Sequence, residues 1–536
     1  MVELDLAVTS DGGKAPTEAP ETGKDLTPMQ QMDIALKDCK FGLFHLRLLF
    51  TALVGYVATV LVSNSSAYLL PAAECDLDMG LVHKGILNGM PYCGMMISCV
   101  VAGFLTDTFG RKMFLMIGYG GDFLFTLLSA SSQTYKVLIS GKFFEGFFFA
   151  MARSPTMSFT SEFCHTGIRD RMMLCQSSFG AMAQIIIAIM SWQILIRDWR
   201  LTLFDGYLVF HNWNFYLFAC SLWSLSATIL YGILPETPKY LLTRKKYKEA
   251  RDVLTLMYTT NTGKSADTFP HRNLWKNQAD LETSYTADHP EQKSIKYQIV
   301  QGLHNMKQLY RRPLFGHLVH ICCMIFFCMS MYNVIRMWFP QLSTIIEHSE
   351  RGYNNVSQDL CERLDAYTAG LRETALNSTD GAVNTCSGKV SGIETYVNVI
   401  ILGLVCLVPY LVSGVLVNRV GKKCLLFCAG LLTVAVVLGL RHANSKPVIV
   451  ALFATFAAIS QLMIGLLQAT LIELFPTSVR TLAISILMMV GRIGTLISNV
   501  AFPILLDMGC IIPFYSMAAI MCVLTALAVF LPEKKT

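Results

Sequence analysis

Charged side chains stand inside long apolar stretches of this sequence. One stretch contains Lys142, Glu145 and Arg153, and two later stretches contain Arg336 and Arg492. Ionisable groups within a membrane are costly, and by default they mark sites that bind a solute or an ion. A guanidinium in such a place can hold a carboxylate through two hydrogen bonds. These five residues are therefore the first candidates for binding a solute, or for coupling its movement to a proton.

Each of these charges also has a structural interpretation. Lys142 and Glu145 are three residues apart, so on a helix they share a face and can form an ion pair. Asp122, in a neighbouring apolar stretch, is a further candidate partner for a cation on that helix. Arg336 lies near the expected outer end of its stretch and can extend to the membrane surface. Arg492 can pair with another helix, so both interpretations stay open for all of them.

Long apolar runs are the elements that position these charges. Of the 536 residues, 53% are hydrophobic and 15% are charged, whereas a soluble protein averages about 25% charged residues. A run of about 20 apolar residues spans a lipid bilayer as a helix. Twelve such runs are predicted, near residues 43–63, 86–106, 112–132, 137–160, 172–195, 214–234, 314–338, 396–417, 424–441, 447–470, 481–505 and 511–531. The expected fold is therefore an all-α membrane protein.

Polar segments divide the chain between these runs. The predicted parts are a disordered cytoplasmic tail (1–40), an N-terminal six-helix bundle (41–234), a cytoplasmic linker with short helices (235–313), a C-terminal six-helix bundle (314–531) with an outer loop (342–393), and a cytoplasmic tail (532–536). An amphipathic helix is expected within the linker from Tyr247 to Tyr258.

The distribution of basic residues predicts the orientation. Lys and Arg are concentrated on the side of the N-terminus and the linker, which the positive-inside rule places in the cytoplasm together with the C-terminus. The outer loop then lies outside the cell or in a vesicle lumen. It carries glycosylation sequons at Asn355 and Asn377. A disulfide between Cys361 and Cys386 would fit an oxidising compartment, and no Cys or His spacing indicates a metal site.

Two short motifs occur twice, with the same offset of 311 residues. Gly103, Asp107, Gly110, Arg111 and Lys112 correspond to Gly414, Asn418, Gly421, Lys422 and Lys423, with Arg419 added in the second copy, and Glu162 and Arg169 correspond to Glu473 and Arg480. Glycines permit a tight turn between helices, and basic residues fix a loop on the cytoplasmic side. Taken alone, one copy is explained by a short charged loop. The duplication indicates two related halves with an inner gate and a solute site between them.

Further segments accompany these motifs. Pro235–Leu242 follows the sixth run, Glu473–Thr477 follows the tenth, Ala73–Leu77 follows the first, and Trp338–Gln341 ends the seventh. Together with the duplicated loop, they resemble the major facilitator superfamily over nearly the whole chain after residue 40, and within it the synaptic vesicle glycoprotein 2-like group, which is related to the organic-ion and sugar-porter branches.

The resemblance implies twelve transmembrane helices in two pseudo-symmetric six-helix bundles, with a cavity lined by the first, fourth, seventh and tenth helices. It associates the region of Lys142 with coupling and the region of Arg492 with anion transport. The glutamine and asparagine motif of hexose carriers is absent from the seventh helix. Further candidates are polar or aromatic residues of the cavity helices, namely Tyr56, Gln184, Tyr332, Asn333, Tyr396, Asn398, Gln461 and Gln468. Each of them is also explained by a hydrogen bond between packed helices.

We therefore expect a solute carrier rather than an enzyme. It would move a small organic solute, with an anion or zwitterion favoured, by secondary active or facilitative transport with alternating access, with a coupling proton as an option. We expect no cofactor, no metal and no nucleic-acid partner, and a monomer in the lipid bilayer of the plasma membrane or of a vesicle. The alternative is a non-transporting vesicle or cell-surface protein that binds partners and regulates trafficking.

Overall fold

The computed structural model describes residues 27–203, 205, 208–275, 314–349, 359–377, 391–406, 408, 419–475 and 477–531. Within these ranges, the side chains of residues 100–109, 154, 349, 373–377 and 477–482 are not described.

Long helices make up both halves of the described chain. The first half contains α2 (Leu43–Ala73), α3 (Leu81–Phe109), α4 (Arg111–Ala130), α5 (Tyr135–Glu162), α6 (Thr166–Leu195) and α7 (Asn212–Ile233), and the second contains α12 (Leu314–Ser349), α14 (Ile393–Val405), α16 (Lys422–Arg441), α17 (Lys446–Leu474), α18 (Thr477–Asp507) and α19 (Ile511–Val529). Each helix overlaps one of the twelve predicted runs, and for the run 396–417 the overlap is with α14, which ends at Val405. Within the described residues, nine helices are long and apolar enough to cross a membrane. The all-α membrane fold is confirmed.

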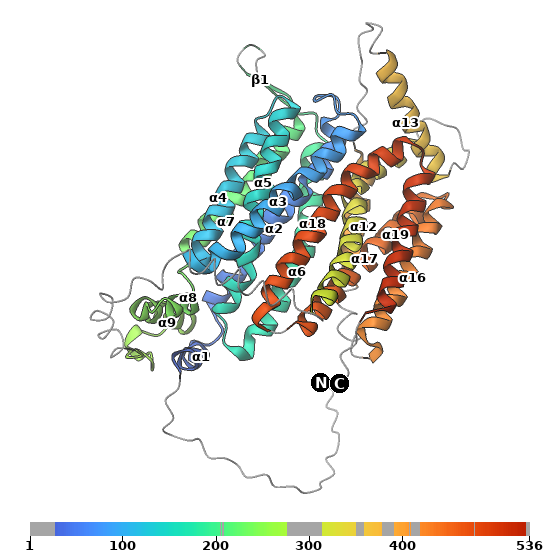
Figure 1. The fold of residues 1–536 in the computed structure, drawn as a ribbon. Coiled ribbons are helices and arrows are strands. Elements are labelled where there is room, and N and C mark those ends of the chain that lie inside the picture. Colours follow the sequence, from blue (N-terminus) through green and yellow to red (C-terminus); the bar gives the residue numbers. More distant parts are fainter. Residues whose placement is uncertain are drawn as a thin grey trace, which may run out of the picture.

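The two halves form two bundles that lie side by side (Figure 1). α3 packs along α18, and α2 packs along α12. Within the first bundle, α3 and α5 approach closely through glycines: a Cβ at Gly94 would overlap the carbonyl of Phe143, and a Cβ at Gly146 would overlap that of Pro91. Small residues at such crossings let membrane helices approach to backbone contact. This contact fixes the position of α5, which carries Lys142, Glu145 and Arg153.

The duplicated glycines occupy equivalent places in the two bundles. Gly110 precedes α4 with a φ of +99°, and Gly421 precedes α16 with a φ of +84°. Only glycine adopts such a backbone without strain. The repeat in the sequence is therefore a repeat in backbone geometry.

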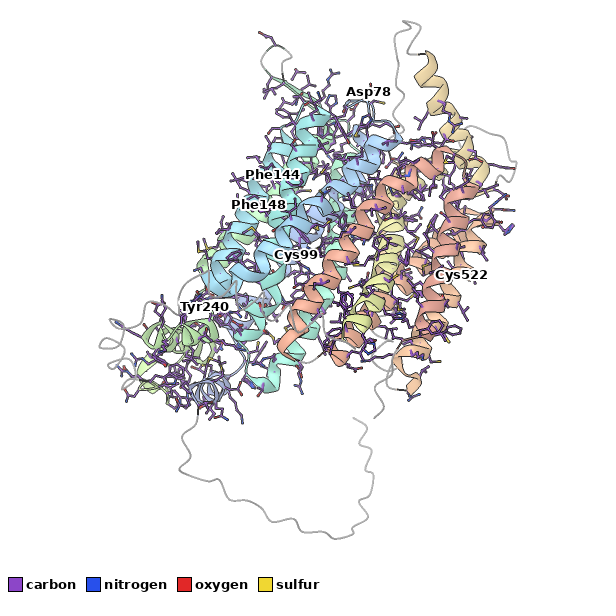
Figure 2. All side chains as sticks on the ribbon, viewed as in Figure 1. Asp78, Cys99, Phe144, Phe148, Tyr240 and Cys522 are labelled. Carbon is purple, nitrogen blue, oxygen red and sulfur yellow. A yellow bond between two sulfur atoms is a disulfide. The ribbon has the colours of Figure 1, made fainter. Side chains whose placement is uncertain are left out.

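Short helices gather at one end of the bundles, which we name the α9 end. They are α1 (Pro28–Asp38), α8 (Pro238–Thr243), α9 (Tyr247–Thr262) and the 3-10 helix η2 (Ala266–Thr268). The opposite end carries α13 (Leu360–Asn377) and the hairpin of β1 (Leu201–Leu203) and β2 (Leu208–Phe210), and we name it the α13 end. Asp78 and Tyr240 mark the two ends of the first bundle in Figure 2.

Several expectations about the polar segments need correction. The prediction of a disordered tail over 1–40 is wrong for α1, because its apolar face, with Met32 and Leu36, is buried. The tip of α9 also binds the end of this segment, since Asn261 Nδ2 donates to the carbonyl of Cys39 at 3.0 Å. The amphipathic helix predicted from Tyr247 is confirmed as α9. The outer loop predicted from residue 342 begins later, because α12 continues to Ser349.

Candidate functional site

A cavity of about 390 Å³ lies between the two bundles. Its walls come from α2, α5 and α6 of the first bundle and from α12, α14 and α17 in the second. The lining residues are Tyr56, Thr59, Val60, Ser63, Phe149, Arg153, Met157, Ser177, Gly180, Ala181, Gln184, Tyr332, Arg336, Gly403, Cys406, Gln461 and Gln468. This volume is within the range of pockets that bind small molecules, about 300–1,000 Å³.

Two arginines line this cavity, one from each bundle. Arg153 extends from α5, and its guanidinium carbon lies 4.4 Å from the centre of the Tyr56 ring. Arg336 extends from α12, and its guanidinium carbon lies 5.3 Å from the centre of the Tyr332 ring. A guanidinium is attracted to the face of an aromatic ring. The lining residues that the structure describes thus include two guanidiniums and no Asp or Glu.

Hydrogen bonds hold Arg336 in place. Its Nη2 donates to Asn333 Oδ1 at 3.0 Å and to the hydroxyl of Tyr92 at 3.3 Å. Asn333 is itself fixed, because its Nδ2 donates to Thr495 Oγ1 at 3.0 Å. The interpretation of Arg336 as a residue reaching the membrane surface is wrong: α12 extends thirteen residues beyond it, so Arg336 lies inside the bundle. Asn333 supports the site without lining it.

Arg492 stands next to the cavity but is not among the residues that line it. From α18 it donates through Nη1 to the backbone carbonyl of Met95 on α3 at 3.1 Å. It therefore bonds the second bundle to the first through a neutral group. Electrostatic repulsion also acts between Arg492 and Arg153, which adds to the positive character of this region.

Polar amides complete the cavity wall. Gln184, Gln461 and Gln468 line it as predicted. Gln184 Oε1 accepts a hydrogen bond from Asn64 Nδ2 at 3.3 Å. Asn398 lies elsewhere and donates to Ser343 Oγ at 3.1 Å. The candidate set lacked Ser177, Phe149 and other small or apolar lining residues, because nothing in their local sequence distinguishes them from packing residues.

Lys142 and Glu145 form the predicted ion pair, with a distance of 2.8 Å between Lys142 Nζ and Glu145 Oε2. Both are fully buried. Lys142 also donates to Ser65 Oγ at 2.9 Å, and Glu145 accepts from Ser129 Oγ at 2.5 Å. The pair thus connects α5 with α2 and α4 inside the first bundle. Neither residue lines the cavity described above.

Asp122 does not form the ion pair that was considered for it. Its Oδ2 accepts a hydrogen bond from Ser224 on α7, and both residues are buried. This contact ties α4 to α7, which is a structural role for the carboxyl group.

A polar cluster closes the interface between the bundles at the α13 end. Lys84 Nζ lies 2.8 Å from Glu74 Oε1 and 3.1 Å from the hydroxyl oxygen of Tyr367 on α13. Gln341 on α12 donates to the same hydroxyl at 3.1 Å, and that hydroxyl donates to Glu74 Oε1 at 3.3 Å. Burial raises the pKa of the Tyr367 hydroxyl, and the nearby negative charge of Glu74 raises it further. The phenol therefore keeps its proton. We name Glu74, Lys84, Gln341 and Tyr367 the α13 cluster.

A disulfide anchors α13 to the second bundle. Cys361 pairs with Cys510, at the start of α19, and the predicted pairing with Cys386 is therefore wrong for Cys361. The reason is that the first turn of α13 packs on the turn between α18 and α19, where Asp365 Oδ1 also accepts from the backbone N–H of Cys510 at 2.8 Å. Cys386 lies outside the described residues, and Cys75 is also disulfide-bonded.

The duplicated motifs place one ion pair in each bundle at the α9 end. Arg111 Nη2 lies 2.9 Å from Glu162 Oε1 in the first bundle, and Lys422 pairs with Glu473 in the second. The two pairs are related by the offset of 311 residues, so the repeat extends to side-chain contacts. Arg169 instead donates to the carbonyl of Cys164 at 3.4 Å.

The segment Pro235–Leu242 adds further contacts beside the Arg111–Glu162 pair in the first bundle. Glu236 Oε2 accepts from the backbone N–H of Lys112 at 3.2 Å, at the start of α4. A carboxylate there satisfies a free helix N–H and interacts favourably with the helix dipole. Thr237 Oγ1 donates to Glu162 Oε2 at 2.7 Å. Neither Glu236 nor Thr237 was among the predicted gate residues, although the segment that contains them was noted in the sequence.

Several predicted gate residues lie outside the residues, or the side chains, that the structure describes. Gly414 and Asn418 lie outside the described residues, as do the side chains at positions 103, 107 and 480. Arg419 is described at the start of the following segment, and it is exposed.

The sequons have different surroundings. Asn355 lies outside the described residues, and Asn377 is the last residue of α13, where its side chain is not described. A third match at Asn64 is buried in α2.

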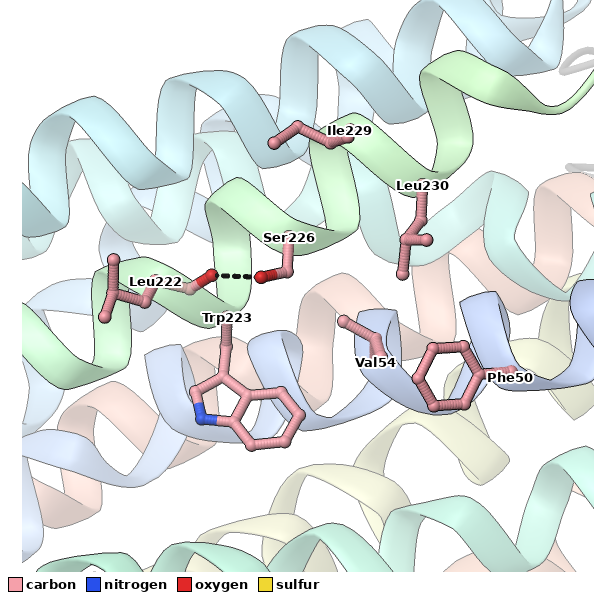
Figure 3. Close-up of a pocket in the computed structure, with 7 residues that line it drawn as sticks. All are labelled: Phe50, Val54, Leu222, Trp223, Ser226, Ile229 and Leu230. Atoms are coloured by element: carbon pink, nitrogen blue, oxygen red, sulfur yellow. Dashed lines mark hydrogen bonds between the residues drawn. The ribbon is translucent and has the colours of Figure 1, made fainter.

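A second cavity, of about 450 Å³, lies between α2 and α7. Figure 3 shows its lining residues, which include Phe50, Leu222 and Trp223. Ser226 supplies a hydroxyl there, but it donates to the carbonyl of its own helix at Leu222, 2.7 Å away. This groove therefore presents apolar surface and no charge, in contrast to the cavity between the bundles.

Comparison with known proteins agrees with this architecture. The family model "Sugar (and other) transporter" matches residues 49–338, which is more than half of the chain, and the model "Major Facilitator Superfamily" matches residues 387–536.

Curated relatives are similar over part of the chain. The human synaptic vesicle glycoprotein 2C is 28% identical over 233 residues, which is 43% of this chain and 32% of that protein. The human synaptic vesicle glycoprotein 2A is 26% identical over 251 residues, which is 47% of this chain and 33% of that protein. The matched region thus spans about one third of the length of these relatives.

Solved structures show the same fold. The inward open conformation of the xylose transporter XylE from E. coli matches with a TM-score of 0.63 and 14% identity, over 92% of this chain and 97% of that one. Its partially occluded inward open conformation matches with a TM-score of 0.59 and 13% identity, over 92% and 100%. This chain is a multi-pass membrane protein that belongs to the sugar (and other) transporter family of the major facilitator superfamily and is related to the synaptic vesicle glycoproteins 2.

Proposed function

We propose that the protein transports a small organic anion by alternating access through the cavity between the bundles. The observation that carries this proposal is the pair of arginines, Arg153 and Arg336, in a cavity whose described lining contains no carboxylate. Guanidinium groups bind carboxylates through paired, charge-assisted hydrogen bonds. A site of this kind favours an anion over a neutral or cationic solute of the same shape.

A neutral sugar fits this site less well, although XylE is a xylose transporter. A sugar would leave both guanidiniums without counter-charge in a region of low dielectric, where uncompensated charge is costly. An organic cation would add a fourth positive charge beside Arg153, Arg336 and Arg492. Tyr56, Tyr332 and Phe149 add ring faces against which an unsaturated or aromatic part of the solute can stack.

The α9 end faces the cytoplasm in this proposal, because the basic linker between the halves belongs to that end. Hydrogen bonds between described residues of the two bundles lie at the α13 end and in the middle, at Tyr367, Tyr92 and Arg492. This distribution supports a state that is closed at the α13 end. Alternating access then requires the α13 cluster to separate and the α9 end to close.

The test is uptake into proteoliposomes that contain the purified full-length chain. The probes are labelled benzoate, phthalate, xylose and tetraethylammonium, so that charge varies while the solutes stay small. We expect saturable uptake of the anions and not of xylose or tetraethylammonium. Uptake of xylose alone would indicate that the transported solute is a neutral sugar rather than an anion. No uptake of any probe by folded, correctly inserted protein would favour the non-transporting alternative, in which the chain binds partners and regulates trafficking.

A matched pair of variants ties uptake to the site. Arg336→Gln removes a cavity cation, whereas Arg197→Gln removes an arginine that stacks on Trp199 in the segment between α6 and β1. Anion uptake should fall only in the first variant. An equal fall in both would show that the cavity charge does not select the solute.

A further inference from the structure

Positive charge reaches the centre of the protein from both bundles. Arg153 belongs to the first bundle, and Arg336 and Arg492 belong to the second. None of the ion pairs between described residues includes one of these three arginines. The described lining of the cavity therefore holds one guanidinium from each bundle and no carboxylate, and Arg492 lies beside it.

Most hydrogen-bond donors of the two cavity arginines remain available. A guanidinium has five N–H donors. Arg336 uses Nη2 for Tyr92 and Asn333, while its Nε is buried and has no partner in the structure. Arg153 is exposed to the cavity, and its contact is the ring of Tyr56. Each bundle thus offers one guanidinium that can receive an acidic group.

We propose that the carrier is an exchanger of dianions, in which an anion with two acidic groups must occupy the cavity for the bundles to change orientation. The proposal rests on the transport function proposed above. When the cavity is sealed from water, repulsion between like charges increases, because the dielectric constant around them falls. An empty carrier would have to bring Arg153 against Arg336 and Arg492 without compensation. A bound dianion supplies one acidic group to each bundle and removes that barrier.

A monoanion does this less well. Its single carboxylate neutralises one of the facing guanidiniums and leaves the other uncompensated. The two tyrosine rings, one beside each arginine, favour a flat, unsaturated spacer between the two acidic groups. Phthalate and benzoate form a matched pair for this comparison, because they share the ring and differ by one carboxylate.

The test measures whether internal anion is required for uptake. Proteoliposomes containing the full-length chain are loaded with gluconate alone, with gluconate and chloride, with gluconate and benzoate, or with gluconate and phthalate. Uptake of external labelled phthalate is then followed. We expect internal phthalate to raise the initial rate about tenfold or more over gluconate alone, the factor that corresponds to 1.4 kcal/mol. Internal chloride or benzoate should raise it much less.

The outcomes separate this proposal from the one on which it rests. Equal rates with and without internal phthalate would overturn exchange while leaving transport intact, and equal stimulation by chloride or benzoate would overturn the requirement for a dianion. No anion flux under any loading would instead overturn the transport function itself. These arms use the unaltered protein, so they do not depend on any variant folding.

A charge variant gives a second, independent measurement. Arg153→Gln removes the cavity cation of the first bundle, so that one acidic group suffices to compensate Arg336, the remaining arginine of the cavity lining. We expect the variant to take up benzoate at least as well as phthalate and to lose most of its dependence on internal anion. Arg197→Gln, outside the cavity, should behave like the original protein. An Arg153→Gln carrier that still requires internal phthalate would contradict the proposal.

Discussion

Helix α5 carries two kinds of intramembrane charge. Lys142 and Glu145 neutralise each other in a dry environment and receive further hydrogen bonds from Ser65 and Ser129. Arg153, two to three turns further along, faces a cavity and has a tyrosine ring as its contact. The same helix thus holds a saturated pair and an unsaturated cation. The comparison indicates that a charged side chain with a counter-charge and hydrogen bonds within the protein has a structural role. A charged side chain without a counter-charge remains able to bind a solute, whatever its depth in the membrane.

The largest expected effect comes from breaking the saturated pair. Glu145→Leu leaves Lys142 buried without a counter-charge, and removal of one partner of a buried ion pair costs about 3–5 kcal/mol. We expect poor insertion or a clear fall in the thermal unfolding midpoint of the purified protein in detergent. An unfolding midpoint like that of the original protein would show that the pair contributes little to the fold.

A double variant serves as the control for this prediction. Lys142→Met with Glu145→Leu removes both charges and keeps the volume, and such replacements are often neutral or stabilising. Recovered stability together with retained anion uptake would confirm a structural role. Recovered stability with loss of proton dependence of transport would instead assign Glu145 to coupling, which is the role considered for it from the sequence.

The next effect concerns the unsaturated charges. Arg336→Gln should weaken apparent affinity for labelled phthalate roughly 30-fold, which corresponds to about 2 kcal/mol for a lost charge-paired contact, with little change in the unfolding midpoint. Arg492→Gln should have a smaller effect on affinity, because Arg492 bonds to a backbone carbonyl and does not line the cavity. A larger loss for Arg492→Gln than for Arg336→Gln would move the anion site toward α18.

The smallest effects are expected at the duplicated ion pairs. Arg111 and Glu162 are 17% and 6% exposed, whereas Lys422 and Glu473 are 24% and 54% exposed. Exposed pairs contribute about 0–1 kcal/mol, so Lys422→Gln should hardly change the unfolding midpoint and Arg111→Gln should lower it visibly. Equal shifts would indicate that the two halves of the repeat carry equal weight despite their different burial.

Sequence periodicity predicted most of the fold. Runs of about 20 apolar residues located the helices, since a bilayer sets their length, and the common offset of the two motifs predicted the pseudo-symmetry of the bundles. The helices in polar segments, and the ends of the long helices, were less predictable. α1 and the last turns of α12 depend on tertiary packing, and local composition does not report packing.

The candidate site was predicted in part. Arg153, Tyr332, Arg336, Gln184 and Gln461 were named as candidates and line the cavity. Arg492 and Asn333 adjoin it, because a shift of one residue turns a side chain by about 100° around a helix and decides whether it faces a cavity or a neighbour. The disulfide of Cys361 was assigned to a cysteine close by in sequence, whereas the actual partner is 149 residues away. Which cysteines meet across so many residues depends on the topology of the fold, and a short motif in the sequence does not encode that topology.

The Cys361–Cys510 bond has a consequence for biosynthesis. Cys361 leaves the ribosome 149 residues before its partner, and at 5–20 residues per second this interval is roughly 7–30 s. During that time α14, α16, α17 and α18 must enter the membrane before the bond can form. The covalent attachment of α13 therefore waits for Cys510, and a nascent chain remains without it until the segment that precedes α19 has emerged.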